Sequence, residues 1–225
     1  MSVTLFDELR AACGEAWQRY VDHPFVRGLA EGTLPQPCFS HYLTQDYLFL
    51  LQLARAYGLA AFKAERLEEL QFATRGLSAI IDREVRMHVT YCAGWGLSEA
   101  EMAATSEVGE TMAYTRFVLD RGMAGDLLDL LVALAPCIVG YGEIGRTLLA
   151  DPRTRREGNP YGAWIETYAA ADYQAVADGH IRQMDAVMRR RGSPARRDVL
   201  IETFRHATRL EANFWTMGLH PPPLV

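Results

Sequence analysis

A cysteine in the middle of an apolar helix is the first residue whose type and position could do chemistry. Within "DLLVALAPCIVGYGEIG", residues 129–145, Cys137 comes three residues after Leu134 and four before Tyr141, which places all three on one helix face. Small residues surround it: Ala133, Ala135, Gly140 and Gly142. They predict a cavity with a thiol in its wall, and a thiol suits covalent catalysis because sulfur is both a good nucleophile and a good leaving group. A cysteine alone on such a face is more often an ordinary core residue.

Two carboxylates show the same pattern on other helices. Asp46 in "FSHYLTQDYLFLL" lies four residues after Tyr42 and four before Leu50, and Glu211 in "TFRHATRLEANFW" lies four after Ala207. A carboxylate on a core-facing stripe is costly unless it is paired or neutralised. Each one alone is explained by a hydrogen bond to a neighbouring helix. Two of them in one bundle predict a polar pocket, in which one carboxyl donates a proton and the other accepts hydrogen bonds.

Aromatic residues at inward-facing positions could supply flat walls for such a pocket. The candidates are Tyr114, Tyr141, Tyr161, Trp164 and Tyr168. Aromatic rings at helical spacing are usually core residues, so each one alone predicts only packing. With the thiol and the two carboxylates, they indicate a site for covalent chemistry on a small, flat ligand.

The elements that must position these residues are helices, because apolar residues recur at helical spacing along almost the whole chain and no long alternating stretch predicts a sheet. The predicted helices cover about 5–20, 39–62, 66–91, 106–120, 125–149, 159–191 and 194–220. Ser98 with Glu101 resembles a capping box, and Asn159 with Pro160 resembles a helix start. The sequence therefore predicts an all-α fold, a single-domain multi-helix bundle over residues 1–225.

Composition narrows the class of protein. The chain has 225 residues, is 49% hydrophobic and carries a net charge of -5, which favours a globular protein and gives no general attraction for nucleic acid. No leader segment opens it, and its longest uninterrupted apolar run is far shorter than the ~20 residues that cross a bilayer. Its four cysteines form no CxxC pair, so we expect reduced thiols, a cytoplasmic location and no membrane partner. The basic stretch 188–197 is expected to be a solvated turn between helices.

Six segments stand in order from about His23 to Met217: "HPFVRGLAEGTLP", "FSHYLTQDYLFL", "AYTRF", "ALAPCIVGYGEIG", "NPYGAWIETY" and "RLEANFW". Together they resemble the TenA family, the thiaminase II or aminopyrimidine aminohydrolase group. The resemblance implies a heme-oxygenase-like helical fold, commonly a homotetramer, with no metal and no organic cofactor. It implies hydrolysis of 4-amino-5-aminomethyl-2-methylpyrimidine to the hydroxymethyl compound in thiamin salvage, and in some members cleavage of thiamin.

The resemblance also implies a role for each candidate residue. Cys137 would be the nucleophile and Glu211 the proton donor to the leaving amine, while Asp46, Tyr141 and Tyr168 would hold the pyrimidine. Tyr114 and Phe49 would also line the substrate site. The family often has a tyrosine three residues after the aspartate, thought to assist the thiol, whereas this chain has Phe49. Another hydroxyl then assists Cys137, or the protein is slower or acts on a different substrate.

Three other functions remain open from the residues. A di-metal oxidase on the same fold would use Glu84 and His88, one turn apart, with His180 on a later helix. A heme oxygenase would need His23 as the iron ligand, although Pro24 makes that segment a turn into a helix. A catalytically weak pyrimidine-binding or regulatory protein is the third alternative, and Phe49 is the residue that suggests it.

Overall fold

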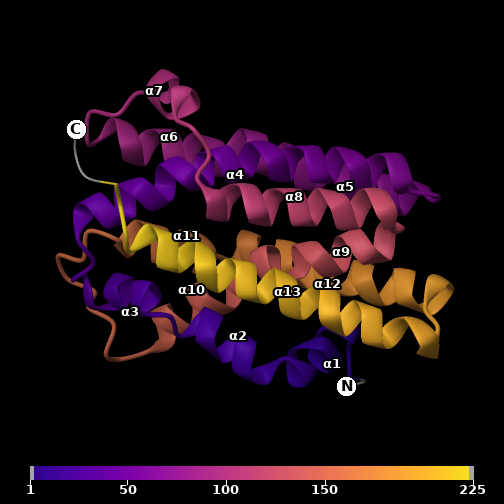
Figure 1. The fold of residues 1–225 in the computed structure, drawn as a ribbon. Helices are drawn as coiled ribbons and strands as arrows, with labels where there is room; N and C mark the ends of the chain where they lie inside the picture. The colour runs from indigo at the N-terminus through magenta and orange to yellow at the C-terminus, as the bar shows by residue number, and fades with distance from the viewer. Residues whose placement is uncertain (1–2, 223–225) are drawn as a thin grey trace.

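Every regular element within residues 3–222, the part of the chain that the computed structural model describes, is helical, which confirms the predicted all-α fold. The elements are α1 (Leu5–Ala12), α2 (Gly14–Val21), α3 (Pro24–Glu31), α4 (Gln36–Lys63), α5 (Leu67–Ala79), η1 (Ile80–Glu84), α6 (Val85–Ala93), α7 (Glu99–Ala104), α8 (Gly109–Ala124), α9 (Leu127–Ala135), η2 (Pro136–Gly140), α10 (Tyr141–Ala150), α11 (Gly162–Ala169), α12 (Ala171–Arg191) and α13 (Pro194–Gly218). The two η segments are π-helical turns. Figure 1 shows α4, α8 and α13 running along the length of the bundle.

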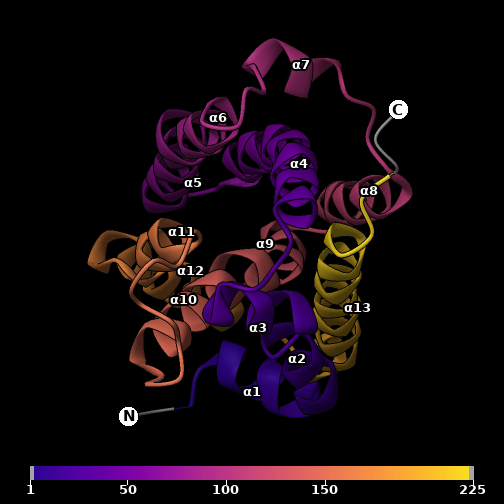
Figure 2. The ribbon, with the colours of Figure 1, turned by 90° about the vertical axis from the view of Figure 1, so that its left-hand side faces the viewer.

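Helix α9 lies at the centre of the bundle and packs against α4, α8, α12 and α13 (Figure 2). All nine of its residues are buried, which accounts for a sequence that is apolar on every face. The helix starts at a capping box, in which the Asp126 side chain accepts from the backbone N–H groups of Leu128 and Asp129. The core around α9 therefore fixes the helix that leads into Cys137.

The chain continues from α9 through η2 into α10 as one rod. Leu127–Ala150 is 24 residues long with a mean hydropathy of 1.8, so by length and composition it passes the test for a membrane span. The helix is longer than any uninterrupted apolar run in the sequence, because charged residues such as Asp129 and Glu143 lie within it. The most apolar part of the rod is 94% buried inside the protein, and a core helix of a soluble fold has this same composition.

Two glycines near Cys137, Gly140 and Gly145, serve close packing, while the predicted cavity with the thiol in its wall lies beside η2. A Cβ atom built on Gly140 would lie 2.4 Å from the ring of Tyr20, and one on Gly145 would lie 2.6 Å from the backbone carbonyl carbon of Tyr168. The Tyr20 hydroxyl donates to the carbonyl oxygen of Pro136 at 3.1 Å. Glycine therefore lets a neighbouring ring and a neighbouring helix approach the backbone of η2 and α10.

Three predicted helices keep their positions but differ in continuity. The first is broken at Cys13 into α1 and α2, and the third contains the π-turn η1. The helix predicted over 159–191 begins at Gly162 and breaks at Ala170, where the backbone is extended. Asn159 does not cap this helix; its amide group donates to the carbonyl oxygen of Leu29 at 2.9 Å and anchors the preceding loop.

Other predicted boundaries are confirmed. The helices expected over 39–62 and from Pro194 correspond to α4 and α13, and the latter ends before Pro221 as expected. Ser98 and Glu101 form the predicted capping box of α7.

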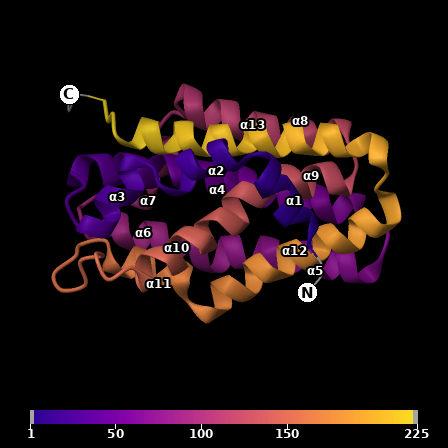
Figure 3. The ribbon, with the colours of Figure 1, turned by 90° about the horizontal axis from the view of Figure 1, so that it is seen from below.

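The basic stretch 188–197 is an ion-pair cluster, which corrects the prediction of a solvated turn. Helices α12 and α13 meet there, close to the start of α5 (Figure 3). The arginines contact acidic residues of α5 and the α9 cap: Arg190 pairs with Glu69, Arg191 with Glu65 and Asp126, and Arg196 with Asp126 and Asp129. These pairs join three parts of the chain at one end of the bundle.

Candidate functional site

A small interior cavity of about 20 Å³ lies beside η2. Its lining residues come from α4, η1, η2, α10, α11 and α12: Asp46, Phe49, Leu50, Leu53, Glu84, Cys137, Ile138, Tyr141, Tyr168 and Tyr173. Five of the seven predicted site residues are among them, namely Cys137, Asp46, Phe49, Tyr141 and Tyr168. Both π-turns contribute to the wall, and π-turns occur frequently at functional sites because they turn side chains out of the regular helical register.

Cys137 is the thiol in this wall and is only 6% exposed. Its Sγ atom lies 3.1 Å from the carbonyl oxygen of Leu134, one turn earlier. Burial raises the pKa of the thiol well above its ordinary value, and the charges of Glu211 and Glu84 raise it further. The thiol therefore carries its proton at neutral pH and needs an acceptor for that proton before it can act as a nucleophile.

Tyr114 and Glu211 are paired beside the cavity and do not line it. The Tyr114 hydroxyl donates to Glu211 Oε1 at 2.8 Å, and both residues are buried. Hydrogen bonding with the same hydroxyl lowers the pKa of the Cys137 thiol, which opposes the effect of burial. Tyr114 thus stands between the predicted nucleophile and the predicted proton donor. Burial is the main cause that raises the pKa of Glu211 to about 8; the Tyr114 hydrogen bond opposes it and the charge of Asp46 adds to it. This carboxyl is therefore protonated at neutral pH.

Phe49 lies against this pair. Its ring centroid is 4.9 Å from that of Tyr114. Phe49 has no hydroxyl, and the hydroxyl that acts on Cys137 belongs to Tyr114 on α8. Tyr114 is therefore the candidate for the other hydroxyl that the substitution at position 49 calls for.

Asp46 is held by two hydrogen bonds on the same oxygen. His88 Nε2 lies 2.6 Å and the Tyr42 hydroxyl 3.0 Å from Asp46 Oδ2. The other ring nitrogen of His88, Nδ1, lies 2.8 Å from the carbonyl oxygen of Glu84, so it must donate there. Burial acts to lower the pKa of His88, but the charge of Asp46 and their hydrogen bond raise it by more. Asp46 Oδ1 makes no hydrogen bond with the described residues, and Asp46 is one of the residues that line the cavity, so this oxygen is free to accept a hydrogen bond.

Sequence reasoning missed several residues of the site. The sequence offers His88 as a metal ligand or as a hydrogen-bonded partner of Glu84, and it does not indicate the side-chain partner Asp46, which lies 42 positions away. Glu84 lines the cavity from η1, and burial raises the pKa of its carboxyl to about 7. Tyr173 closes the cavity from α12, with its hydroxyl 3.3 Å from the carbonyl oxygen of Ile138. The Glu84–His88 spacing was the available signal, because it places both residues on one inward face.

Two of the predicted aromatic residues line the cavity, and others pack behind them or point away from it. Tyr141 and Tyr168 line the cavity and meet edge to face, with ring centroids 5.0 Å apart. The Tyr42 hydroxyl reaches that of Tyr141 at 3.5 Å. Trp164 packs behind both rings, and the hydroxyl of Tyr161 donates to the carbonyl oxygen of Leu34, away from the cavity.

The histidines of the metal and heme alternatives have other partners. Within residues 3–222 no group of three or more His, Cys, Asp or Glu side chains is arranged to hold a metal ion. His180 Nε2 lies 2.8 Å from the carbonyl oxygen of Leu131. His23 caps α3, where its Nδ1 accepts from the backbone N–H of Phe25 at 3.2 Å. These contacts give the di-metal and heme hypotheses no structural support.

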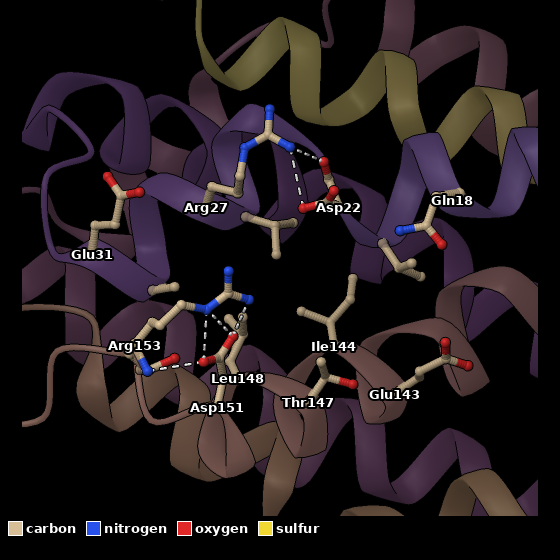
Figure 4. Close-up of a pocket in the computed structure, with 14 residues that line it drawn as sticks. Gln18, Asp22, Arg27, Glu31, Glu143, Ile144, Thr147, Leu148, Asp151 and Arg153 are labelled. Carbon is tan, nitrogen blue, oxygen red and sulfur yellow. Dashed lines mark hydrogen bonds and ion pairs between the residues drawn. The ribbon is translucent and has the colours of Figure 1, made fainter.

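A larger groove opens elsewhere on the surface, between α2, α3 and α10 (Figure 4). Four of its charged groups form two ion pairs, Arg27 with Asp22 and Arg153 with Asp151, and Glu143 pairs with Arg10 outside the lining. None of the predicted site residues lines it. Because the predicted thiol and five of the seven predicted site residues line the interior cavity instead, that cavity is the candidate active site.

The chain is similar to known proteins over most of its length. The chain is 40% identical over 203 residues to an uncharacterized protein of Haemophilus influenzae, covering 90% of this chain and 93% of that one. It is 34% identical over 204 residues to an aminopyrimidine aminohydrolase of Halalkalibacterium halodurans, covering 90% and 89%. A crystal structure of a TenA family transcription regulator from Silicibacter sp. TM1040 superposes with a TM-score of 0.91 at 45% identity, over 96% of this chain and 97% of that one.

The fold is that predicted from the resemblance. A domain of unknown function with a heme oxygenase-like fold, from Shewanella denitrificans, matches with a TM-score of 0.72 at 14% identity, over 96% of this chain and 92% of that one. The sequence profile of the TENA/THI-4/PQQC family matches residues 10–220, nearly the whole chain. The chain belongs to the TENA/THI-4/PQQC family.

Proposed function

We propose that the protein is an aminopyrimidine aminohydrolase that replaces the amine of 4-amino-5-aminomethyl-2-methylpyrimidine by a hydroxyl group through a covalent adduct on Cys137. One observation carries the proposal: a buried thiol, a hydroxyl-linked carboxylic acid and an anchored carboxylate with a free oxygen converge on one small aromatic cavity. The relative from Halalkalibacterium halodurans, named for this class of reaction, supports it.

The three groups divide the binding and the first chemical step. The free Oδ1 of Asp46 accepts hydrogen bonds from the donors of the aminopyrimidine, while the rings of Tyr141 and Tyr168 hold its faces. The thiol proton of Cys137 passes through the Tyr114 hydroxyl to the ionised form of Glu211, and the thiolate adds to a ring carbon. The ring then expels the side-chain amine, which takes its proton from Glu211 and leaves as ammonia.

The second step returns the site to its starting state. The adduct now carries an exocyclic methylene group, and the Glu211 carboxylate accepts a proton from water as the oxygen adds to that carbon. The ring regains aromaticity by expelling the Cys137 thiolate. The expelled thiolate takes its proton back from Glu211 through the Tyr114 hydroxyl, so Cys137 and Glu211 end the cycle as they began it. The net reaction consumes one water and releases one ammonia.

The test is to incubate the purified full-length protein with 4-amino-5-aminomethyl-2-methylpyrimidine and measure ammonia and the hydroxymethyl product. Cys137→Ser and Glu211→Gln should remove turnover. Cys92→Ser, at another buried cysteine that lies outside the cavity, should retain it. If the folded native protein forms no product but calorimetry shows that it binds the pyrimidine, the hydrolase proposal is wrong and the binding or regulatory alternative holds.

The homotetramer and the cytoplasmic location also stand as proposals. Large apolar side chains lie exposed where α4 and α8 end and α5 begins, at one end of the bundle (Figure 1): Phe62 is 86%, Met123 72% and Leu67 65% exposed. Such a group favours contact with another copy of the chain. The four cysteines are free thiols, as in proteins of a reducing compartment.

A further inference from the structure

A second, outer groove lies against the wall of the interior cavity. Eight residues of η1, α5, α6, α11 and α12 line it: Ala79, Arg83, Glu84, Met87, Thr167, Asp172, Tyr173 and Val176. Two of them, Glu84 and Tyr173, also line the interior cavity. Only these two side chains therefore belong to both spaces, and together they form a partition between the surface groove and Cys137.

We propose that this outer groove is the entrance to the active site, and that the Glu84 and Tyr173 side chains are the door through which the substrate and the released amine pass. The inference deepens the proposed function, because it concerns access to the same cavity. The proposed hydrolysis gives Glu84 and Tyr173 no part in the reaction, and this inference assigns them control of access.

The contacts of the two side chains suit a partition that opens. Within residues 3–222 the carboxylate of Glu84 makes no hydrogen bond or ion pair; only its backbone carbonyl is bonded, to His88. The Tyr173 hydroxyl holds the backbone of η2 by long bonds alone, 3.3 Å to the carbonyl oxygen of Ile138 and 3.5 Å to that of Cys137. Rotation of both side chains would break few good hydrogen bonds, so the cost of opening is low.

On each side of the outer groove a helix is interrupted close to one of the two shared residues. Glu84 ends the π-turn η1, and Tyr173 follows the extended residue Ala170 that separates α11 from α12. Interrupted helices open locally more easily than continuous ones, because fewer consecutive hydrogen bonds hold them. Glu84 and Tyr173 therefore both lie next to interruptions of their helices.

An ion pair joins the two sides of the groove. Arg83 of η1 contacts Asp172 of α12 at 2.8 Å, and the two side chains are 67% and 63% exposed. Each is the immediate chain neighbour of a door residue. The pair ties η1 to the start of α12, and loss of either charge should make opening more frequent.

The larger groove of Figure 4 is the rival route. It shares no lining residue with the interior cavity. It offers matched controls, because its mouth carries an ion pair of similar exposure, Arg27 with Asp22 at 3.1 Å, and a threonine, Thr147, in its lining.

The experiment measures how fast iodoacetamide alkylates Cys137 in the full-length native protein, by peptide mass spectrometry and without substrate. The readout does not require turnover, so a failure of the proposed function and a failure of this inference are told apart. Thr167→Trp, which fills the outer groove, should slow alkylation about tenfold, whereas Thr147→Trp should leave the rate unchanged. Cys13, Cys38 and Cys92 in the same sample serve as internal references for global unfolding.

Opening the ion pair should act in the other direction. Arg83→Ala and Asp172→Asn should each accelerate alkylation roughly two- to fivefold, the range that loss of an exposed ion pair allows, while Arg27→Ala should not. The two substitutions change the local charge in opposite senses, so acceleration by both reports opening and not a shift of the thiol pKa. Slowing by Thr147→Trp, slowing by neither tryptophan, or opposite effects of the two ion-pair variants would overturn the proposal.

Discussion

At the scale of single residues, the site depends on a line of three groups from three helices. The Tyr114 hydroxyl of α8 donates to Glu211 of α13, and the same hydroxyl lowers the pKa of Cys137 of η2. The thiol and the carboxyl are both protonated at neutral pH, because burial raises the pKa of each. The Tyr114 hydroxyl therefore provides a path by which the thiol proton of Cys137 can reach Glu211 when that carboxyl is ionised.

Tyr114→Phe tests this role. The change removes the hydrogen bond that lowers the pKa of Cys137, so the pH at which half of the thiol is alkylated by iodoacetamide should rise. If the proposed hydrolase activity holds, kcat should fall about a hundredfold, the usual contribution of a positioned proton-transfer group. The matched control is Tyr47→Phe, which removes a tyrosine hydrogen bond to Glu99 at 3.3 Å outside the cavity. An unchanged alkylation profile in Tyr114→Phe would show that the hydroxyl does not act on the thiol.

At the scale of elements, the sequence predicted the regular helices well and their interruptions poorly. Long stripes at helical spacing gave α4 and α13 their correct boundaries, and the same stripes placed Asp46, Glu211 and Cys137 inward. A π-turn adds a single residue, which scarcely disturbs the apolar period of a long helix, so η1 and η2 left no readable mark. The break at Ala170 contains no glycine or proline and arises from packing between distant segments, as does the pairing of Asp46 with His88.

The close approach of α10 to α11 gives a prediction for stability. Gly145→Ala places a methyl group against the backbone of Tyr168, which cannot rotate away, so the free energy of unfolding should fall by about 1–3 kcal/mol. Gly58→Ala is the control in α4, where an added Cβ meets no atom within 4 Å, and there the free energy of unfolding should rise by up to about 1 kcal/mol. Urea unfolding measures both; equal effects would mean that the packing at Gly145 is not limiting.

At the scale of the whole molecule, the bundle buries a histidine that must stay neutral. His180 of α12 donates through Nε2 to the carbonyl oxygen of Leu131 on the central helix α9, and its Nδ1 finds no partner among the described residues. Burial lowers its pKa from 6.5 to about 4. Between pH 6.5 and 4 the His180 imidazole binds a proton in the unfolded chain but stays neutral in the folded protein. This residue therefore makes the protein less stable as the pH falls from 6.5 to 4.

His180→Gln should flatten that part of the stability profile. The native protein should lose about 3 kcal/mol from this source across the window, since each pKa unit corresponds to about 1.4 kcal/mol. The free energy of unfolding of the variant should therefore fall less steeply with acid, with any constant cost of the substitution appearing equally at all pH values. His206→Gln, at an exposed histidine, should run parallel to the native protein. Parallel curves for all three proteins would contradict a neutral buried His180.

The π-turn η2 makes the site sensitive to chain length as well as to residue identity. An α-helix advances by about 100° per residue, so deleting one residue from η2 would restore a regular helix and rotate everything after it by that angle. Tyr141 would then leave the cavity, and Gly145 would no longer face Tyr168. An evolutionary path to this site by substitutions alone would therefore be difficult, whereas a single inserted codon supplies the rotation in one event. Relatives that lack the extra residue are expected to have lost the cavity even where every side chain named here is retained.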